Sequence, residues 1–136
     1  MSGNDIRIKN LDAIKKNIKA YPIDFLNLLK NKNDNFDISL ELIETKSKKY
    51  SAKVFKNGKS IFLHSAYNPE KEANALINEI KKETEKDLDL VFIFGIGAGY
   101  LINAFKKLNI NIAVIEPSIK FFNLLIDNFK LDKILE

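Results

Sequence analysis

The residues whose types and spacing could do chemistry lie around a glycine-rich turn in the second half of the chain. The candidate ligand-binding residues are Gly95, Gly97, Gly99, Tyr100 and Glu116. Glycine permits a sharp turn from a strand into a helix and lets the backbone approach a ligand closely. Free N–H groups at the start of the helix attract a phosphate or carboxylate, and an acid at the end of the next strand accepts hydrogen bonds from ribose hydroxyls. The pattern predicts a nucleotide-type site.

The spacing of the glycines leaves two interpretations open. It is G-x-G-x-G, which differs from the G-x-G-x-x-G of dinucleotide-binding proteins. This stretch resembles S-adenosylmethionine methyltransferases, which use the shorter spacing. Those enzymes usually carry an acid two residues before the first glycine, where this chain has Ile93. The turn is either a ligand site or a junction whose glycines only allow a strand and a helix to pack tightly.

Other residues with catalytic or metal-binding chemistry are few. His64 is the only histidine and the chain has no cysteine, so no metal site built on these ligands is expected. Ser65 follows His64, but neighbouring side chains on an extended chain point in opposite directions and cannot pair directly. We therefore interpret His64 as a structural histidine, and the sequence assigns no catalytic residue.

Composition and charge limit the classes of function. The chain of 136 residues is 46% hydrophobic and 29% charged, which is typical of a globular protein. Its net charge of +4 comes from lysines spread along the chain, with Arg7 as the only arginine, so nucleic-acid binding is not expected. No secretory signal or membrane-spanning apolar run is visible. The absence of cysteine fits a reducing compartment, and a cytoplasmic location is expected.

The elements that position the glycine turn begin with a helical segment over residues 1–35. Leu11, Ile14 and Ile18 recur at helical spacing. Asn10 precedes them, and asparagine is a favoured N-cap residue, so this helix is expected to begin after Asn10.

Residues 36–88 predict a β-meander followed by a helix. Apolar and polar residues alternate in two successive runs, which is typical of strands with one buried face. Asn57-Gly58 then provides the favoured pair for a tight type I′ hairpin turn. Further on, Asn68 is expected to cap a helix that has Pro69 as its first residue.

Residues 89–136 predict a Rossmann-like βαβα half-unit that is truncated at its C-terminal end. The run 90–94 is continuously apolar, as expected for a strand covered on both faces. A short helix, a second buried strand over 112–115 and a helix from about Ser118 follow. A doubly wound sheet needs more than two parallel strands, so we expect either a fragment or a sheet completed by the meander. The fold class is α/β with α+β features.

A series of short motifs occurs in a recognisable order. They are Lys56-Asn57-Gly58-Lys59, Leu63-His64-Ser65-Ala66-Tyr67-Asn68-Pro69, Glu72-Ala73, Phe94-Gly95-Ile96-Gly97-Ala98-Gly99-Tyr100 and Val114-Ile115-Glu116-Pro117. Together they resemble the N-terminal region of bacterial motility accessory factor proteins, which are flagellin glycosyltransferase-like. The resemblance covers about residues 36–136 and rests on the order of the motifs, since each alone is weak.

The resemblance implies a function for the full-length protein. Members of this family are several times longer, and they are thought to transfer nonulosonic acids from CMP donors to flagellin serine or threonine. Their catalytic region is a separate central domain, so no catalytic residue is carried over to this chain. The resemblance implies a non-catalytic N-terminal domain with the rest of the polypeptide and flagellin as partners, and it adds a CMP-sugar to the candidate ligands. The sequence does not decide whether the chain forms a homo-oligomer.

An alternative function comes from the glycine turn itself. In this interpretation the chain is the S-adenosylmethionine- or nucleotide-binding fragment of a methyltransferase-type enzyme.

Overall fold

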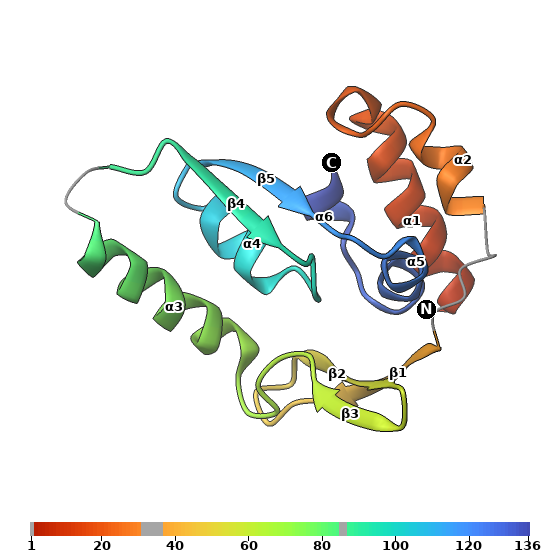
Figure 1. Ribbon diagram of the computed structural model, residues 1–136, viewed down its shortest axis with the longest axis horizontal. Helices are drawn as coiled ribbons and strands as arrows, with labels where there is room; N and C mark the ends of the chain where they lie inside the picture. Colours follow the sequence, from red (N-terminus) through yellow and green to blue (C-terminus); the bar gives the residue numbers. More distant parts are fainter. Residues whose placement is uncertain (1, 31–36, 85–86) are drawn as a thin grey trace.

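The computed structural model describes residues 2–30, 37–84 and 87–136 and has a mixed α/β architecture (Figure 1). Its helices are α1 (Gly3–Lys16), the 3₁₀ turn η1 (Ile18–Ala20), α2 (Phe25–Lys30), α3 (Pro69–Glu83), α4 (Tyr100–Lys106), α5 (Ile119–Asn128) and α6 (Asp132–Leu135). Its strands are β1 (Ile38–Glu44), β2 (Tyr50–Lys56), β3 (Lys59–Phe62), β4 (Leu90–Phe94) and β5 (Asn111–Ile115). Within the described parts of the chain, none of the helices has both the length and the apolar character needed to cross a bilayer.

The strands form two separate sheets. β1, β2 and β3 pair antiparallel in that order, whereas β4 and β5 pair parallel. The meander therefore does not complete the parallel sheet. Figure 1 shows α1, α2, α5 and α6 gathered in one helical layer, with α3, β4, α4 and β5 on the other side of the molecule.

The first helix begins earlier than the sequence predicts. Ser2 precedes α1, and the carboxylate of Asp5 accepts hydrogen bonds from the backbone N–H of Ser2 (3.1 Å) and from its hydroxyl (2.8 Å). These bonds close the first turn of the helix. The prediction that Asn10 is the N-cap is therefore wrong, because the helix is already established when the chain reaches Asn10.

Asn10 instead joins α1 to the far end of the chain. Its side chain is fully buried, and its Nδ2 donates to the carbonyls of Ile126 (2.8 Å) and Phe129 (2.7 Å). Its Oδ1 accepts a hydrogen bond from the N–H of Leu131 at 2.9 Å. A single amide thus satisfies three backbone groups where α5 ends and the chain turns into α6.

The two local turn predictions in the first half of the chain are confirmed. Asn57 and Gly58 both have positive φ, 51° and 75°, as a type I′ hairpin turn requires. The Oδ1 of Asn68 accepts from the N–H of Lys71 at 3.0 Å, and Pro69 is the first residue of α3. Both features depend on neighbouring residues alone, so the local sequence is sufficient to specify them.

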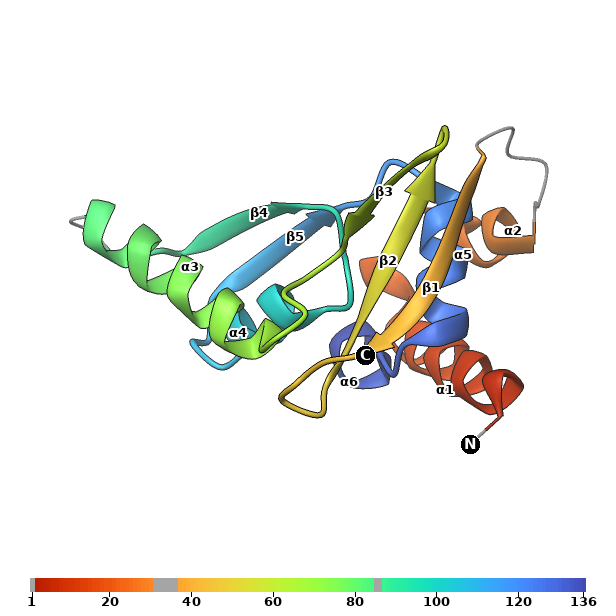
Figure 2. The same cartoon turned by 90° about the horizontal axis from the view of Figure 1, so that it is seen from below.

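The strand β4 has the predicted bounds, but the prediction that both its faces are covered is wrong. Ile93 is buried, whereas Phe92 is 61% exposed and Phe94 is 78% exposed. Figure 2 shows α3 and α4 on one side of the parallel sheet only. Since alternate residues of a strand point to opposite faces, a continuous apolar run here leaves every second side chain uncovered.

One cluster of buried side chains connects the three predicted segments. Its members include Ile14, Leu29, Ala52, Ile77, Phe105 and Leu125. These residues come from the helical segment, from the meander with its helix, and from the C-terminal βαβα unit. The two sheets and the helical layer therefore share one interior.

Candidate functional site: the glycine turn and Glu116

The glycine turn leads from β4 into α4 through left-handed backbone conformations. Gly95, Gly97 and Gly99 have φ values of 86°, 55° and 82°. The N–H of Gly95 donates to the carbonyl of Ile115 at 2.7 Å, so the hydrogen bonding between the parallel strands continues to the first residue of the turn. Glycine is the residue that adopts such φ values at least cost, and the predicted sharp turn is present.

A side chain of the chain itself occupies the space beside Gly97. The Nε2 of His64 accepts a hydrogen bond from the N–H of Ala98 at 2.9 Å. A Cβ atom on residue 97 would lie 2.8 Å from the same nitrogen, so only glycine leaves room for the ring. The N–H of Ala98 is a group that a phosphate bound at this turn would use, and here it is bonded to His64.

The other two glycines of the turn differ in their surroundings. A Cβ atom on residue 99 would overlap the Cδ1 of Ile134 and would lie 3.2 Å from the Cδ2 of Leu131. A Cβ atom on residue 95 would meet no atom within 4 Å outside its two chain neighbours, so only the φ of Gly95 favours glycine there. Close packing of the chain's own residues thus accounts for Gly97 and Gly99.

Tyr100, the first residue of α4, ties the turn to the meander. Its hydroxyl donates to the carbonyl of Tyr50 at 2.5 Å and accepts from the N–H of Tyr50 at 3.1 Å. Its ring meets that of His64 edge-on, with centroids 5.2 Å apart. Burial is the main cause that raises the pKa of Tyr100, so its hydroxyl stays protonated and able to donate.

The surroundings of His64 hold its ring neutral. Burial lowers the pKa of His64, and the nearby charge of Glu72, whose Oε1 is 3.7 Å from Nδ1, partly opposes this shift. Because Nε2 accepts the hydrogen bond from Ala98, the ring proton must reside on Nδ1. These contacts agree with a structural histidine.

Sequence reasoning missed the residue that holds the backbone of His64. The hydroxyl of Ser51 donates to the carbonyl of His64 and accepts from its N–H, both at 3.1 Å, and Ser51 is fully buried. A serine in an alternating strand carries no signal of such a contact, because its partner lies beyond the next strand.

Glu116 stands at the end of β5, next to the glycine turn. Its Oε2 accepts a hydrogen bond from the N–H of Ser118 at 3.2 Å. Burial raises the pKa of Glu116, and hydrogen bonds from the backbone of Ser118 and Ile96 partly offset that rise. The structure thus brings Glu116 beside residue 96 of the turn, whereas Gly99 faces α6.

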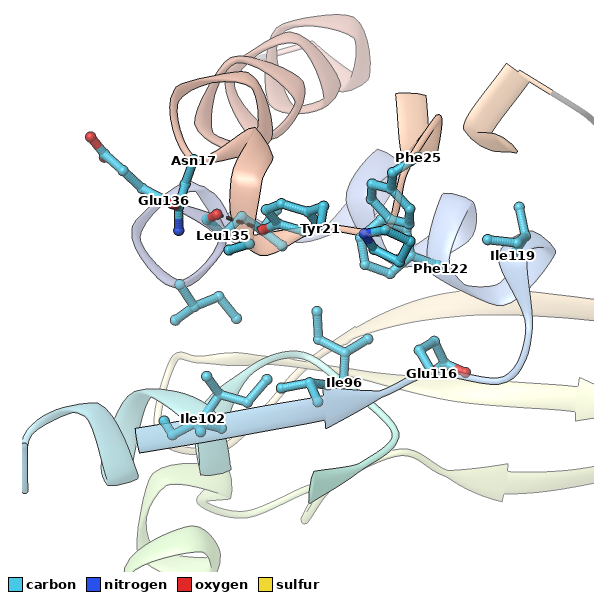
Figure 3. Close-up of a pocket in the computed structure, with 15 residues that line it drawn as sticks. Asn17, Tyr21, Phe25, Ile96, Ile102, Glu116, Ile119, Phe122, Leu135 and Glu136 are labelled. Carbon is cyan, nitrogen blue, oxygen red and sulfur yellow. Dashed lines mark hydrogen bonds between the residues drawn. The ribbon is translucent and has the colours of Figure 1, made fainter. Parts of the chain in front are cut away.

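Glu116 also lines a cavity of about 310 Å³ between the helical layer and the parallel sheet. Figure 3 shows aromatic side chains on the helical side and aliphatic side chains and Glu116 on the side of the sheet. Its walls include Tyr21, Phe25, Ile96, Ile102, Glu116 and Phe122. Sequence reasoning did not find this cavity, because its walls come from opposite ends of the chain.

Two further observations bear on function. Among the described residues, no group of three or more histidine, aspartate and glutamate side chains is arranged to hold a metal ion. Comparisons of the chain with protein-family models, with curated proteins and with solved structures found no match. Functional assignment therefore rests on the geometry of the chain itself.

Proposed function

We propose that the chain is the non-catalytic N-terminal domain of a motility accessory factor-type glycosyltransferase involved in flagellin glycosylation. One observation carries this proposal: motifs that are distant in the sequence meet at the glycine turn. His64, Gly97, Ala98 and Tyr100 contact one another there, and Glu72 lies beside His64. Residues from three of the motifs behind the family resemblance therefore meet at one structural junction.

Side chains of the chain itself fill the space at the glycine turn, which supports a structural role for the turn. The N–H of Ala98 is already bonded to His64, and the space above Gly99 is filled by Ile134. A phosphate could reach this backbone only after the histidine ring had moved. In this proposal, transfer of the nonulosonic acid takes place in another domain of the full-length protein.

We also propose that a Rossmann-like half-unit is formed by β4, α4, β5 and α5. Its support is the parallel pairing of β4 with β5, the intervening helix and the glycine turn at the carboxyl end of β4. The exposed aromatic residues on the open face of this sheet fit a domain that works within a longer polypeptide, since parallel sheets are normally covered on both faces. The rest of that polypeptide and flagellin are the proposed partners.

The length of the natural open reading frame tests this proposal. We expect the frame to continue for several hundred residues past Glu136 into a domain that binds a CMP-sugar. An open reading frame that stops at Glu136 would overturn the proposal.

A ligand screen separates the proposal from the methyltransferase-type alternative. The alternative draws support from Glu116, which lies beside residue 96 at the end of β5. It predicts that S-adenosylmethionine or a nucleotide at millimolar concentration raises the melting temperature and that Gly97→Val abolishes the rise. The structural role of the turn predicts no rise with CMP, a CMP-sugar or S-adenosylmethionine.

A further inference from the structure

We propose that the cavity between the helical layer and the parallel sheet is a binding site for a small organic cation with an apolar body, such as a protonated aromatic amine. Glu116 is the counter-ion in this site. The inference does not depend on the proposed function, because it uses neither the glycine-turn junction nor the family resemblance.

The size of the cavity and the aromatic residues on its wall suit such a ligand. Its volume of about 310 Å³ lies at the lower end of the range of about 300–1,000 Å³ typical of small-molecule pockets. On the helical side, Tyr21 stacks on Phe25 with centroids 5.1 Å apart, and Phe25 meets Phe122 edge-on at 5.4 Å. Aromatic faces attract cations, and the attraction is strongest where water is excluded.

The polar edge of Tyr21 is already in use. Its hydroxyl donates to the carbonyl of Leu135 at 2.5 Å, and burial raises its pKa to about 12. The aromatic ring is therefore the part of Tyr21 that remains for a ligand. Across the cavity, Ile96 and Ile102 provide an aliphatic wall for an apolar body (Figure 3).

The charged side chains around the cavity favour a ligand that carries a positive charge. The described residues that line it include two carboxylates, Glu116 and Glu136, and no lysine, arginine or histidine. Glu136 already pairs with Lys16 at 3.5 Å and lies more than half exposed. Among the charged side chains that line the cavity, a phosphate or carboxylate would meet like charge, whereas an ammonium group would meet an attractive partner.

Glu116 is the carboxylate placed to receive that ammonium group. It is half-buried, and its position is fixed by a hydrogen bond from the N–H of Ser118 at 3.2 Å and by one from the backbone of Ile96. Burial raises its pKa, because a desolvated carboxylate is costly to ionise. A cation seated beside it would remove part of that cost.

Binding of three small molecules with the same ring and different charge tests the proposal. The probes are tyramine (cation), 4-ethylphenol (neutral) and 3-(4-hydroxyphenyl)propionate (anion), followed by thermal shift and by NMR titration. We expect tyramine to bind most tightly, 4-ethylphenol more weakly and the propionate not at all. Equal binding of all three, or no binding of any at millimolar concentration, would overturn the proposal.

One substitution with a matched control tests the role of Glu116. Glu116→Gln keeps the hydrogen-bond acceptor but removes the charge, so we expect the dissociation constant for tyramine to rise about tenfold or more while that for 4-ethylphenol stays unchanged. Glu79→Gln, at an exposed position of α3, removes the same charge far from the cavity and leaves both constants unchanged. Tyramine binding that survives Glu116→Gln contradicts the role of Glu116.

A second variant tests the location without touching Glu116. Val114 lines the cavity from β5 and is 40% exposed, so a larger side chain can be placed there with little strain on the core. Val114→Phe fills the cavity and should abolish binding of both tyramine and 4-ethylphenol. Undiminished binding by this variant, with its fold confirmed by circular dichroism, would show that the ligand sits elsewhere.

Discussion

Single side chains hold the glycine turn in place, and Gly97 and His64 form the closest pair. The ring approaches the backbone so nearly that a methyl group on residue 97 would lie 2.8 Å from Nε2. The same nitrogen receives the hydrogen bond from Ala98. Steric fit and hydrogen bonding therefore depend on one geometry, and both can be tested by substitution.

We expect Gly97→Ala to lower the free energy of unfolding by about 2 kcal/mol or more, from left-handed strain together with the clash against His64. Gly95→Ala is the matched control, since φ is also positive at Gly95 but the Cβ position is open, so its cost is about 1–2 kcal/mol. Urea denaturation measures both. Equal losses for the two variants would show that the histidine ring does not restrict residue 97.

The neutral state of His64 makes stability depend on pH. Its pKa in the folded chain lies below the ordinary value of 6.5, so the unfolded chain takes up the proton first as the pH falls. The contribution of His64 to the free energy of unfolding is therefore fully present above pH 6.5. It is lost as the pH falls towards the lowered pKa of His64 in the folded chain. Melting temperatures of the wild type and of His64→Gln should converge over this range. A constant difference between them would contradict the assignment.

Whole elements are joined by polar contacts between the two ends of the chain. Asn10 in α1 bonds to three backbone groups at the end of α5 and beyond it. Arg7, one helical turn earlier, pairs with Asp127 at 2.6 Å and donates to Asn123 at 3.0 Å. The only arginine of the sequence thus serves the packing of α1 against α5.

Asn10→Ala should destabilise the fold by about 3 kcal/mol or more, because it leaves buried backbone groups without a partner and each costs about 1–3 kcal/mol. Asn4→Ala, at an exposed position of the same helix, should change stability by less than about 0.5 kcal/mol. Chemical denaturation of both variants gives the comparison. A small effect at Asn10 would mean that water or another side chain replaces its amide.

Aromatic residues of the parallel sheet and of its helix differ in how much they contribute to the stability of the fold. Phe105 in α4 is 1% exposed, so Phe105→Ala should cost about 3–5 kcal/mol. Phe94 in β4 is 78% exposed, so Phe94→Ser should cost less than about 1 kcal/mol of unfolding free energy. Urea denaturation of the two variants measures both losses. A large loss of stability in Phe94→Ser would mean that the open face is covered in solution.

At the scale of the whole molecule, one interior joins the two sheets and the helical layer. Ile14, Ala52 and Leu125 belong to the same buried cluster although they come from the first, second and third predicted segments. Tyr100 adds a hydrogen-bonded link between α4 and β2. A shared core couples the loss of one segment to the loss of the others.

We therefore expect a single cooperative unfolding transition with one midpoint for secondary and tertiary structure. Far-ultraviolet circular dichroism reports the helices, and near-ultraviolet signals of the tyrosines report packing, since the chain has no tryptophan. Coincident midpoints support a shared core. Two separated midpoints would show that the segments unfold independently.

The local sequence determined the turns, the cap of α3 and the bounds of several elements. Asn57-Gly58 and Asn68-Pro69 depend on backbone preferences of a few adjacent residues. The sharp turn at 95–99 follows from the freedom of glycine to adopt positive φ, although distant residues pack against Gly97 and Gly99. The continuous apolar run over residues 90–94 likewise determined the first and last residues of β4.

Only the tertiary structure decided what those elements contact. Asn10 looked like a helix cap, yet its partners lie at the other end of the chain, and the open face of β4 cannot be read from its composition. The contact of His64 with Ala98, and the cavity beside Glu116, also join residues distant in sequence. The physical reason is that periodicity and propensity act over one or two turns of chain, whereas burial and hydrogen-bond pairing are settled when distant segments pack.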